Sequence, residues 1–199
     1  MSDTTYHAGM RALQDRFDTR RLADRLDERL GRGAFSEQDR AFIGSRAMFF
    51  LATADAQGRP DCSYKGGNPG FVRVTGPDEL EFPSYDGNGQ FRSLGNVHAN
   101  PAVGLLFIDF ESPRRLRVNG HATVLDDAHA LARHPGAQLV VRVRVARIFP
   151  NCPRYIGKIG SAELLPDVPR PGHEPPVPAW KSMSIVADVL PQGTGGATR

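Results

Sequence analysis

Cysteine, tryptophan and long apolar runs are all scarce in this sequence of 199 residues. The two cysteines, Cys62 and Cys152, lie far apart and outside any Cys-x-x-Cys pair, which argues against a metal or redox pair. No apolar stretch approaches the length of a membrane span, and residues 1–9 are polar where a signal peptide would be apolar. We therefore expect a cytoplasmic protein with no membrane partner.

Motifs of several common protein classes are also missing. The sequence contains no HExxH, GxSxG, GxGxxG or GxxxxGKS/T motif. His129 and His134 are spaced so that they fall on different faces of a helix, and the other histidines are scattered, so no metal site is expected. The 25 basic and 22 acidic residues balance too evenly for the concentrated basic face that nucleic acid requires. We expect neither a metal nor a nucleic acid as a partner.

Helical patterns open the sequence. Residues 5–30 carry apolar side chains at near-helical spacing, which predicts one amphipathic helix that covers a sheet or a partner subunit. Ser36 and Asp39 form a capping-box pattern at the start of a second, shorter helix. Further short helices are expected over residues 91–99 and 126–134.

Segments of strand length follow one another through the middle of the sequence, separated by turn residues. These segments are residues 48–54, 60–65, 71–75, 80–83, 103–109, 115–125 and 139–149. Strands at short spacing with few long helices favour a small antiparallel barrel over an alternating α/β fold. We expect a helix in residues 1–35, a barrel domain in residues 36–165 and a Pro/Gly-rich extension in residues 166–199.

The polar loop and helix start between residues 84 and 96 form the most informative segment. A phosphate at such a helix start would meet free backbone N–H groups and their partial positive charge. Arg92 would add a charge-assisted contact and Ser93 a hydroxyl donor. The alternative is an ordinary connection from strand to helix with Arg92 in solvent, and local spacing alone favours that alternative.

Two further segments carry polar side chains on one strand face. Period two places Ser63 and Lys65 together, where a donor-rich strand would bind a flat heteroaromatic ring and the Lys would stabilise its anionic reduced form. A solvated edge strand is an equally good interpretation. Arg115 and Arg117 likewise line a site or face water, and for charged rows the solvated face is the commoner case. We extend the solvated interpretation to Arg142 and Arg144, with more weight.

Several short motifs, each weak alone, occur in an order that is fairly specific. They are residues 49–60, Ser63-Tyr64-Lys65-Gly66, Phe91-Arg92-Ser93-Leu94-Gly95-Asn96, Asn100-Pro101, Arg117-Val118-Asn119-Gly120 and Asn151-Cys152-Pro153-Arg154-Tyr155-Ile156. This order, over roughly residues 36–160, resembles the FMN-binding split-barrel family, the relatives of pyridoxine 5'-phosphate oxidase. The last motif resembles a branch of predicted flavin-nucleotide-binding proteins within that family.

The resemblance implies a mainly β fold with flanking helices, namely a six-stranded antiparallel split barrel, and a homodimer with FMN at the subunit interface. It places Ser63 and Lys65 against the isoalloxazine ring and Arg92 and Ser93 against the phosphate. Other residues implied in the site are Ser84 and Tyr85 before the loop, Arg115 or Arg117 near the ring, and Trp180 as an aromatic that closes the site from the partner.

The function implied is that of an FMN-dependent oxidoreductase acting on an unidentified small molecule. The alternative is a protein that binds flavin, deazaflavin or haem without turnover. No residue stands out as a catalytic acid or base. The sequence departs from the vitamin B6 oxidases in its last residues, 191–199, and in having Arg92-Ser93 where those enzymes have Arg-Lys. Both departures argue against oxidation of pyridoxine phosphate itself.

Overall fold

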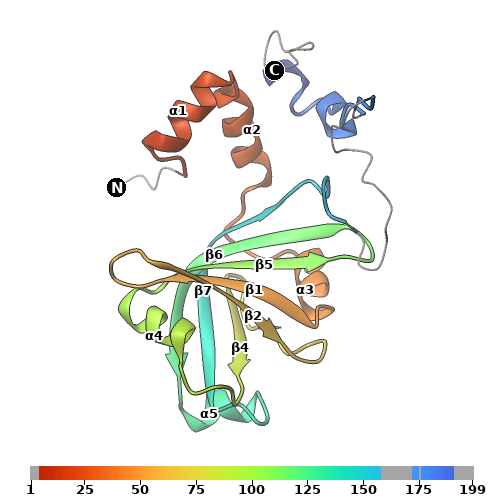
Figure 1. Cartoon of the computed structure of the whole chain (residues 1–199). Coiled ribbons are helices and arrows are strands. Elements are labelled where there is room, and N and C mark those ends of the chain that lie inside the picture. Colours follow the sequence, from red (N-terminus) through yellow and green to blue (C-terminus); the bar gives the residue numbers. More distant parts are fainter. Residues whose placement is uncertain (1–4, 158–171, 175, 191–199) are drawn as a thin grey trace. The chain divides into compact units, whose positions relative to one another are not determined.

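The computed structural model describes residues 5–157, 172–174 and 176–190, which fall into two compact units (Figure 1). The larger unit contains residues 32–157 and holds the sheet. The smaller unit consists of α1 (Ala8–Arg16), α2 (Arg20–Leu30), η1 (Ala179–Ser182) and η2 (Ala187–Val189). Residues 191–199 and most of the proline-rich stretch, for which an extended conformation is expected, lie outside the described residues.

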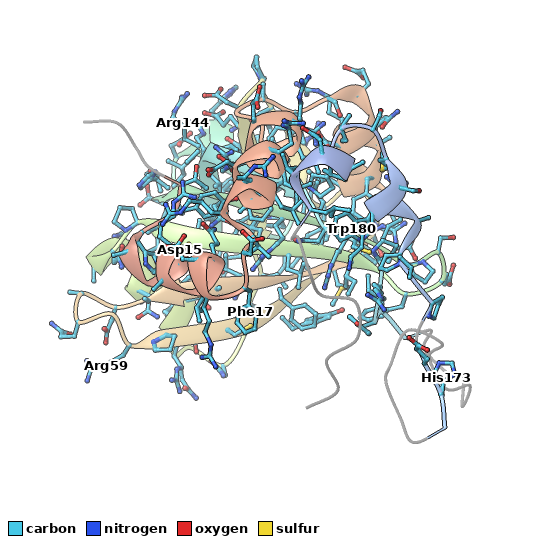
Figure 2. The ribbon with its side chains drawn as sticks, turned by 90° about the horizontal axis from the view of Figure 1, so that it is seen from above. Asp15, Phe17, Arg59, Arg144, His173 and Trp180 are labelled. Carbon is cyan, nitrogen blue, oxygen red and sulfur yellow. The ribbon has the colours of Figure 1, made fainter. Side chains whose placement is uncertain are left out.

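In the smaller unit, the expected single helix is interrupted. Asp18 adopts the left-handed conformation (φ 52°), which ends α1 and allows α2 to begin at Arg20. Leu22 of α2 packs with Val186 and Val189 in a small apolar cluster of its own. Figure 2 labels Phe17, which lies just after α1 and has 60% of its surface exposed.

The larger unit contains one seven-stranded antiparallel sheet. Its strands are β1 (Met48–Ala54), β2 (Pro60–Gly66), β3 (Arg73–Val74), β4 (Glu79–Ser84), β5 (Ala102–Asp109), β6 (Arg114–Leu125) and β7 (Leu139–Pro150). They lie in the order β2-β1-β5-β6-β7-β4-β3, and the sheet is strongly curved (Figure 1). Short turns join β1 to β2, β3 to β4 and β5 to β6. Arg59 lies at the tip of the β1–β2 hairpin (Figure 2).

The prediction of mainly antiparallel β structure with flanking helices is confirmed, but a closed six-stranded barrel is wrong. The two-residue strand β3 pairs with β4 and adds a seventh strand. In the described part of the chain no ladder joins the outer strands β2 and β3 to each other, so the sheet is open. Both outer strands therefore keep an edge whose backbone groups are not used by the sheet.

The core lies on the concave face of the sheet, where alternate residues of each strand point inward. Phe49 is fully buried and packs edge-on against Phe82, with ring centroids 4.9 Å apart. The helices α3 (Glu37–Gly44) and α4 (Arg92–Ala99) add Ile43, Leu94 and Val97 to the same cluster. The helix α5 (Ala128–Ala132) connects β6 to β7. Packing against the core thus holds α4, the expected phosphate helix, in a fixed position.

Two local features of the larger unit match the sequence. The capping box is present: the Ser36 hydroxyl accepts from the Asp39 backbone N–H, and the Asp39 carboxylate accepts from Ser36. Gly120 lies at a bulge between β6 and β7, where a Cβ would overlap the backbone oxygen of Arg144. Only glycine fits at this point of the Arg117–Gly120 motif.

The described residues contain neither a helix that could span a membrane nor a cluster that could hold a metal ion. No helix among them is both long enough and apolar enough to cross a bilayer. No group of three or more His, Cys, Asp or Glu side chains in residues 5–157, 172–174 and 176–190 is arranged to hold a metal ion.

Candidate functional site

The candidate site begins on the edge strand β2, whose side chains alternate between the two faces of the sheet. Asp61, Ser63 and Lys65 are half-buried, and they pair across the ladder with Thr53, Leu51 and Phe49, which all point into the core. Cys62 and Tyr64 are exposed on the other face. Ser63 and Lys65 therefore share a face, as period two predicts, and that face is the concave one.

Lys65 is a cation in partly buried surroundings. Burial lowers the pKa of Lys65 below its ordinary value, and the negative charge of Asp61 raises this pKa in part. An ammonium that has lost part of its water shell interacts more strongly with a nearby anion than a solvated one does. Lys65 is thus suited to stabilising negative charge on a molecule placed against β2.

The helix α4 begins beside this strand. Phe91 adopts the left-handed conformation (φ 47°) just before the helix, and its side chain provides no capping hydrogen bond. In place of a cap, a carboxylate from β2 lies at the helix start: Ser93 Oγ donates to Asp61 Oδ2 at 3.3 Å, and Arg92 Nε lies 3.7 Å from Asp61 Oδ1. A negative charge at the N-terminus of a helix is favourable.

Asp61 is the site residue that sequence reasoning missed. Period two places it on the same strand face as Ser63 and Lys65, so the pattern contained the signal. A carboxylate is an acceptor that repels phosphate, however, so it does not belong to a pattern of phosphate donors. Its role depends on α4 packing beside β2, which no local pattern reveals.

A second contact fixes α4 on the sheet. Asn96 donates from Nδ2 to the hydroxyl of Thr53, which is buried in β1, at 3.0 Å. Leu94 and Val97 bury the apolar side of the same helix. Arg92 and Ser93 are therefore presented by a helix held by both apolar and polar contacts, although the Arg92 side chain itself is 71% exposed.

Arg115 and Arg117 lie on the opposite face of the sheet from Ser63 and Lys65. In the β5–β6 ladder they pair with Ile108 and Leu106. Leu116, which lies between the two arginines, points into the core. Arg117 stacks over Phe149, with its guanidinium carbon 5.3 Å from the ring centroid. Within one chain, the structure does not bring these two arginines to the face of β2 that carries Lys65.

Arg115 differs from Arg117 in its burial. Its Nε is buried and has no hydrogen-bond partner among the described residues. A buried donor without an acceptor costs free energy, and such a group commonly marks a place where another molecule binds. This favours a binding role for Arg115 over the solvated-row interpretation.

The other expected site residues are placed as follows. Ser84 ends β4 and pairs with Leu139, and its backbone oxygen accepts from Gln138 N at 2.9 Å. Tyr85 follows it with an exposed side chain. Trp180 belongs to the smaller unit, where it packs against the cluster of Leu22. The candidate site on β2 and α4 therefore consists of Asp61, Ser63, Lys65, Arg92 and Ser93.

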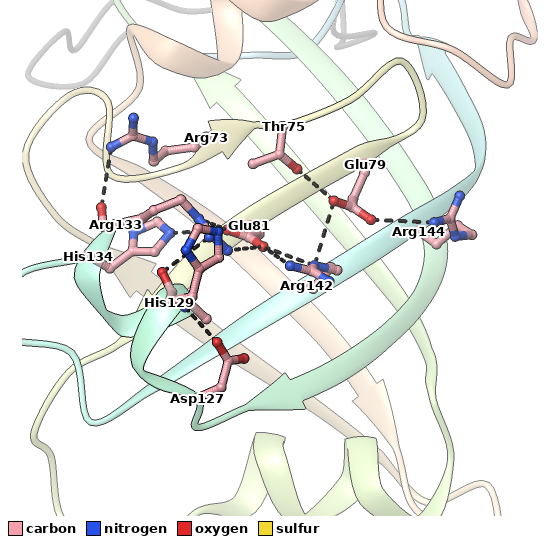
Figure 3. Close-up of polar contacts among 11 residues, drawn as sticks. Arg73, Thr75, Glu79, Glu81, Asp127, His129, Arg133, His134, Arg142 and Arg144 are labelled. Carbon is pink, nitrogen blue, oxygen red and sulfur yellow. Dashed lines mark hydrogen bonds and ion pairs between the residues drawn. The ribbon is translucent and has the colours of Figure 1, made fainter.

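A separate cluster of charges surrounds the fully buried Glu81 of β4 (Figure 3). Arg133, after α5, donates to both carboxylate oxygens at 2.8 and 2.9 Å. Arg142 of β7 donates to Oε1 from Nε and Nη2 at 2.9 and 2.7 Å. The prediction that Arg142 is solvated was wrong, because the β4–β7 ladder pairs it directly with Glu81. Arg144, two residues later, has the expected exposed side chain.

This cluster joins the end of α5 to the sheet, and the charge of Glu81 is neutralised by Arg133 and Arg142. Burial raises the pKa of Glu81, but hydrogen bonds from Arg142 and Arg133 outweigh this and hold the pKa below its ordinary value. Burial lowers the pKa of His134, whose Nε2 lies 3.7 Å from Glu81. A pocket of about 400 Å³ adjoins the cluster. Because both Glu81 oxygens already have guanidinium partners, we interpret this cluster as structural.

The β2–α4 site, by contrast, has the donors that a flavin phosphate requires. The Asp61 carboxylate lies against Arg92 and Ser93, which shows that these side chains can hold an oxyanion at the start of α4. Ser63 and Lys65 lie further along β2 on the same face. The donors of Arg92 and Ser93 match the chemistry of an oxyanion such as the phosphate of FMN, and Asp61 adds a negative charge next to them.

Comparison with known proteins supports the same family. A family model described as pyridoxamine 5'-phosphate oxidase matches residues 35–159. A pyridoxine/pyridoxamine 5'-phosphate oxidase of Anaplasma marginale (strain St. Maries) is 29% identical over 176 residues, which cover 80% of this chain and 70% of that protein.

Two solved structures are similar to this chain. A Lactobacillus delbrueckii protein provisionally named a pyridoxamine 5'-phosphate oxidase is 26% identical, with a TM-score of 0.48 over 59% of this chain and 95% of that one. HupZ of Group A Streptococcus is 21% identical, with a TM-score of 0.47 over 63% of this chain and 99% of that one. The match over residues 35–159 confirms the resemblance seen in the motifs, and the chain belongs to the pyridoxamine 5'-phosphate oxidase family.

Proposed function

We propose that this protein binds FMN on the concave face of β2 and serves as an FMN-dependent oxidoreductase. The observation that carries the proposal is the group formed by Arg92, Ser93 and Lys65 around one face of β2, in a chain of this family. It combines a helix start that holds an oxyanion with a partly buried cation on the same strand.

Each residue of the group has a role in this proposal. Arg92 and Ser93 hold the phosphate at the start of α4, and Ser84 and Tyr85 precede the loop that leads to it. Ser63 and Lys65 face the ring, where Lys65 favours negative charge on the reduced form. Bound FMN supplies the redox chemistry, while the protein supplies orientation and electrostatics.

The remaining residues enter the proposal through a homodimer. Because Arg115 and Arg117 lie on the other face of the sheet, they serve a ring that is bound by a second copy of the chain. The unpaired Nε of Arg115 favours such a contact, and Trp180 would close the same site from the partner. Light scattering should then give about twice the chain mass of 21.7 kDa.

The absorbance of the freshly purified protein tests the cofactor. Flavin, deazaflavin and haem have distinct spectra, and we expect the two visible bands of an oxidised flavin. Anaerobic addition of NADH or NADPH should then bleach these bands if the protein turns over. A haem or deazaflavin spectrum, or a colourless protein that FMN does not restore, would contradict the proposal. Flavin bands that neither NADH nor NADPH bleaches would support FMN binding but contradict turnover with these reductants.

A further inference from the structure

We propose that Asp61 acts as a built-in competitor of the flavin phosphate and weakens the binding of FMN relative to riboflavin. Its carboxylate contacts both side chains proposed to hold that phosphate, Arg92 and Ser93. The consequence is that Asp61 reduces the advantage that its phosphate gives FMN over riboflavin in this site. This inference rests on the proposed function, and it concerns the selectivity of the same site.

Hydrogen-bond capacity is the first reason. A serine hydroxyl has a single hydrogen to donate, and in this structure Ser93 donates it to Asp61. A phosphate oxygen that receives this hydrogen must take it from the carboxylate. Ser93 is buried and held by α4, so it has little freedom to turn toward a different acceptor without losing Asp61. The guanidinium of Arg92 has more donors and can serve both anions.

Charge is the second reason. Asp61 faces two cations, Lys65 and Arg92, and partly neutralises them before any ligand binds. A phosphate dianion brought to Ser93 and Arg92 would lie close to the Asp61 carboxylate, and like charges at such separations repel. Riboflavin ends in a hydroxyl where FMN has the phosphate, so this repulsion acts on FMN alone.

Asp61 also has a structural contribution, which the test has to separate from selectivity. Its charge lies at the start of α4, a helix without a side-chain cap among the described residues, and so stabilises that helix. Asp61→Asn keeps the size of the side chain and an acceptor for Ser93 while it removes the charge. A loss of helix stability would weaken both flavins together, whereas the proposed competition changes their ratio.

The experiment compares FMN and riboflavin on the full-length chain by quenching of flavin fluorescence. We expect Asp61→Asn to tighten FMN by more than about tenfold and riboflavin by less than about threefold. The gain for FMN should shrink as salt is added. Asp126→Asn is the matched control, because Asp126 is exposed and follows β6, away from β2 in the strand order. It removes the same charge and should change neither affinity.

The outcomes separate this inference from the proposed function. If the parent protein binds flavin but Asp61→Asn changes both affinities by the same factor, or weakens FMN, then Asp61 is structural and the competition is overturned. If neither the parent nor Asp61→Asn binds either flavin, the proposed function and the inference fail together. FMN binding that appears only in Asp61→Asn would support the competition strongly.

Discussion

Ser93 donates its hydroxyl hydrogen to Asp61 at 3.3 Å, and this bond links the first turn of α4 to the edge strand β2. In the sequence, the β3–β4 hairpin and a polar loop lie between the two residues. Their contact brings the proposed phosphate-binding helix next to the strand that carries Lys65. This contact and the separate cluster around Glu81 lead to four predictions about individual side chains.

Arg92→Ala should weaken FMN more than riboflavin, because only FMN carries the phosphate that Arg92 is proposed to hold. Loss of a charge-assisted hydrogen bond costs roughly 1.5–3 kcal/mol, which is more than tenfold in affinity. Fluorescence titration of both flavins measures the ratio. Arg59→Ala is a suitable control, since Arg59 lies exposed at the hairpin tip and pairs with Asp55. Equal weakening of both flavins by Arg92→Ala would remove Arg92 from the phosphate site.

Lys65→Met should lower the reduction potential of the bound flavin while the protein stays folded. Reduced flavin carries negative charge, and a partly buried ammonium on the same strand face stabilises that charge. A redox titration measures the potential, and a thermal melt checks folding. Arg144→Met serves as the control, because Arg144 is exposed and pairs with Asp78. If the potential stays unchanged in Lys65→Met, Arg115 and Arg117 remain as the candidates near the ring.

Arg142→Met should destabilise the fold without affecting the site directly. The change removes two hydrogen bonds to the fully buried carboxylate of Glu81, leaving Arg133 as its guanidinium partner. Hydrogen bonds to charged groups contribute about 1.5–3 kcal/mol, so the free energy of unfolding should fall by that order. Urea unfolding measures it. In Arg144→Met the loss should be at most about 1 kcal/mol, as for other exposed ion pairs, and equal losses in the two variants would count against the cluster.

His134 should make the protein less stable as the pH falls below neutrality. Burial lowers the pKa of His134 below the ordinary 6.5. The negative charge of Glu81 raises this pKa in part, whereas Arg73 and Arg133 lower it further. As the pH falls through 6.5, the unfolded chain therefore binds a proton before the folded chain does, and the free energy of unfolding decreases. The decrease should end once the folded-state pKa is passed.

Urea unfolding at several pH values between about 8 and 5 measures this dependence. His134→Gln should give a flatter curve over that range. Glu81 does not confuse the result, because its pKa is lowered from 4.5 and its contribution is lost only at more acidic pH. A slope that is the same in His134→Gln and in the parent would show that other groups cause the dependence.

Features that depend on neighbouring residues were predictable from the sequence. The capping box of Ser36 and Asp39 is a short-range pattern, and the structure contains it. The strand segments and the shared face of Ser63 and Lys65 follow from alternation and turn residues, and these also agree. The break at Asp18 was missed because the apolar spacing of α1 and α2 continues across it while the backbone does not.

Features that depend on the pairing of distant strands were not predictable. The pattern around Arg142 is that of a solvated strand, and only its pairing with Glu81 gives it a buried partner. The face on which Arg115 and Arg117 lie, relative to Lys65, depends on the registers of three ladders in succession. The contact of Asp61 with Ser93 likewise requires α4 to pack beside β2.

A crystal structure of the protein with FMN tests the central claim most directly. The account predicts the phosphate at the start of α4, within hydrogen-bond distance of Arg92 and Ser93 at about 2.7–3.0 Å, with Asp61 released from the Ser93 hydroxyl. It also predicts that the ring lies against Ser63 and Lys65 on the concave face of β2. A phosphate bound elsewhere, or a ring on the face of β2 that carries Cys62 and Tyr64, would contradict the account.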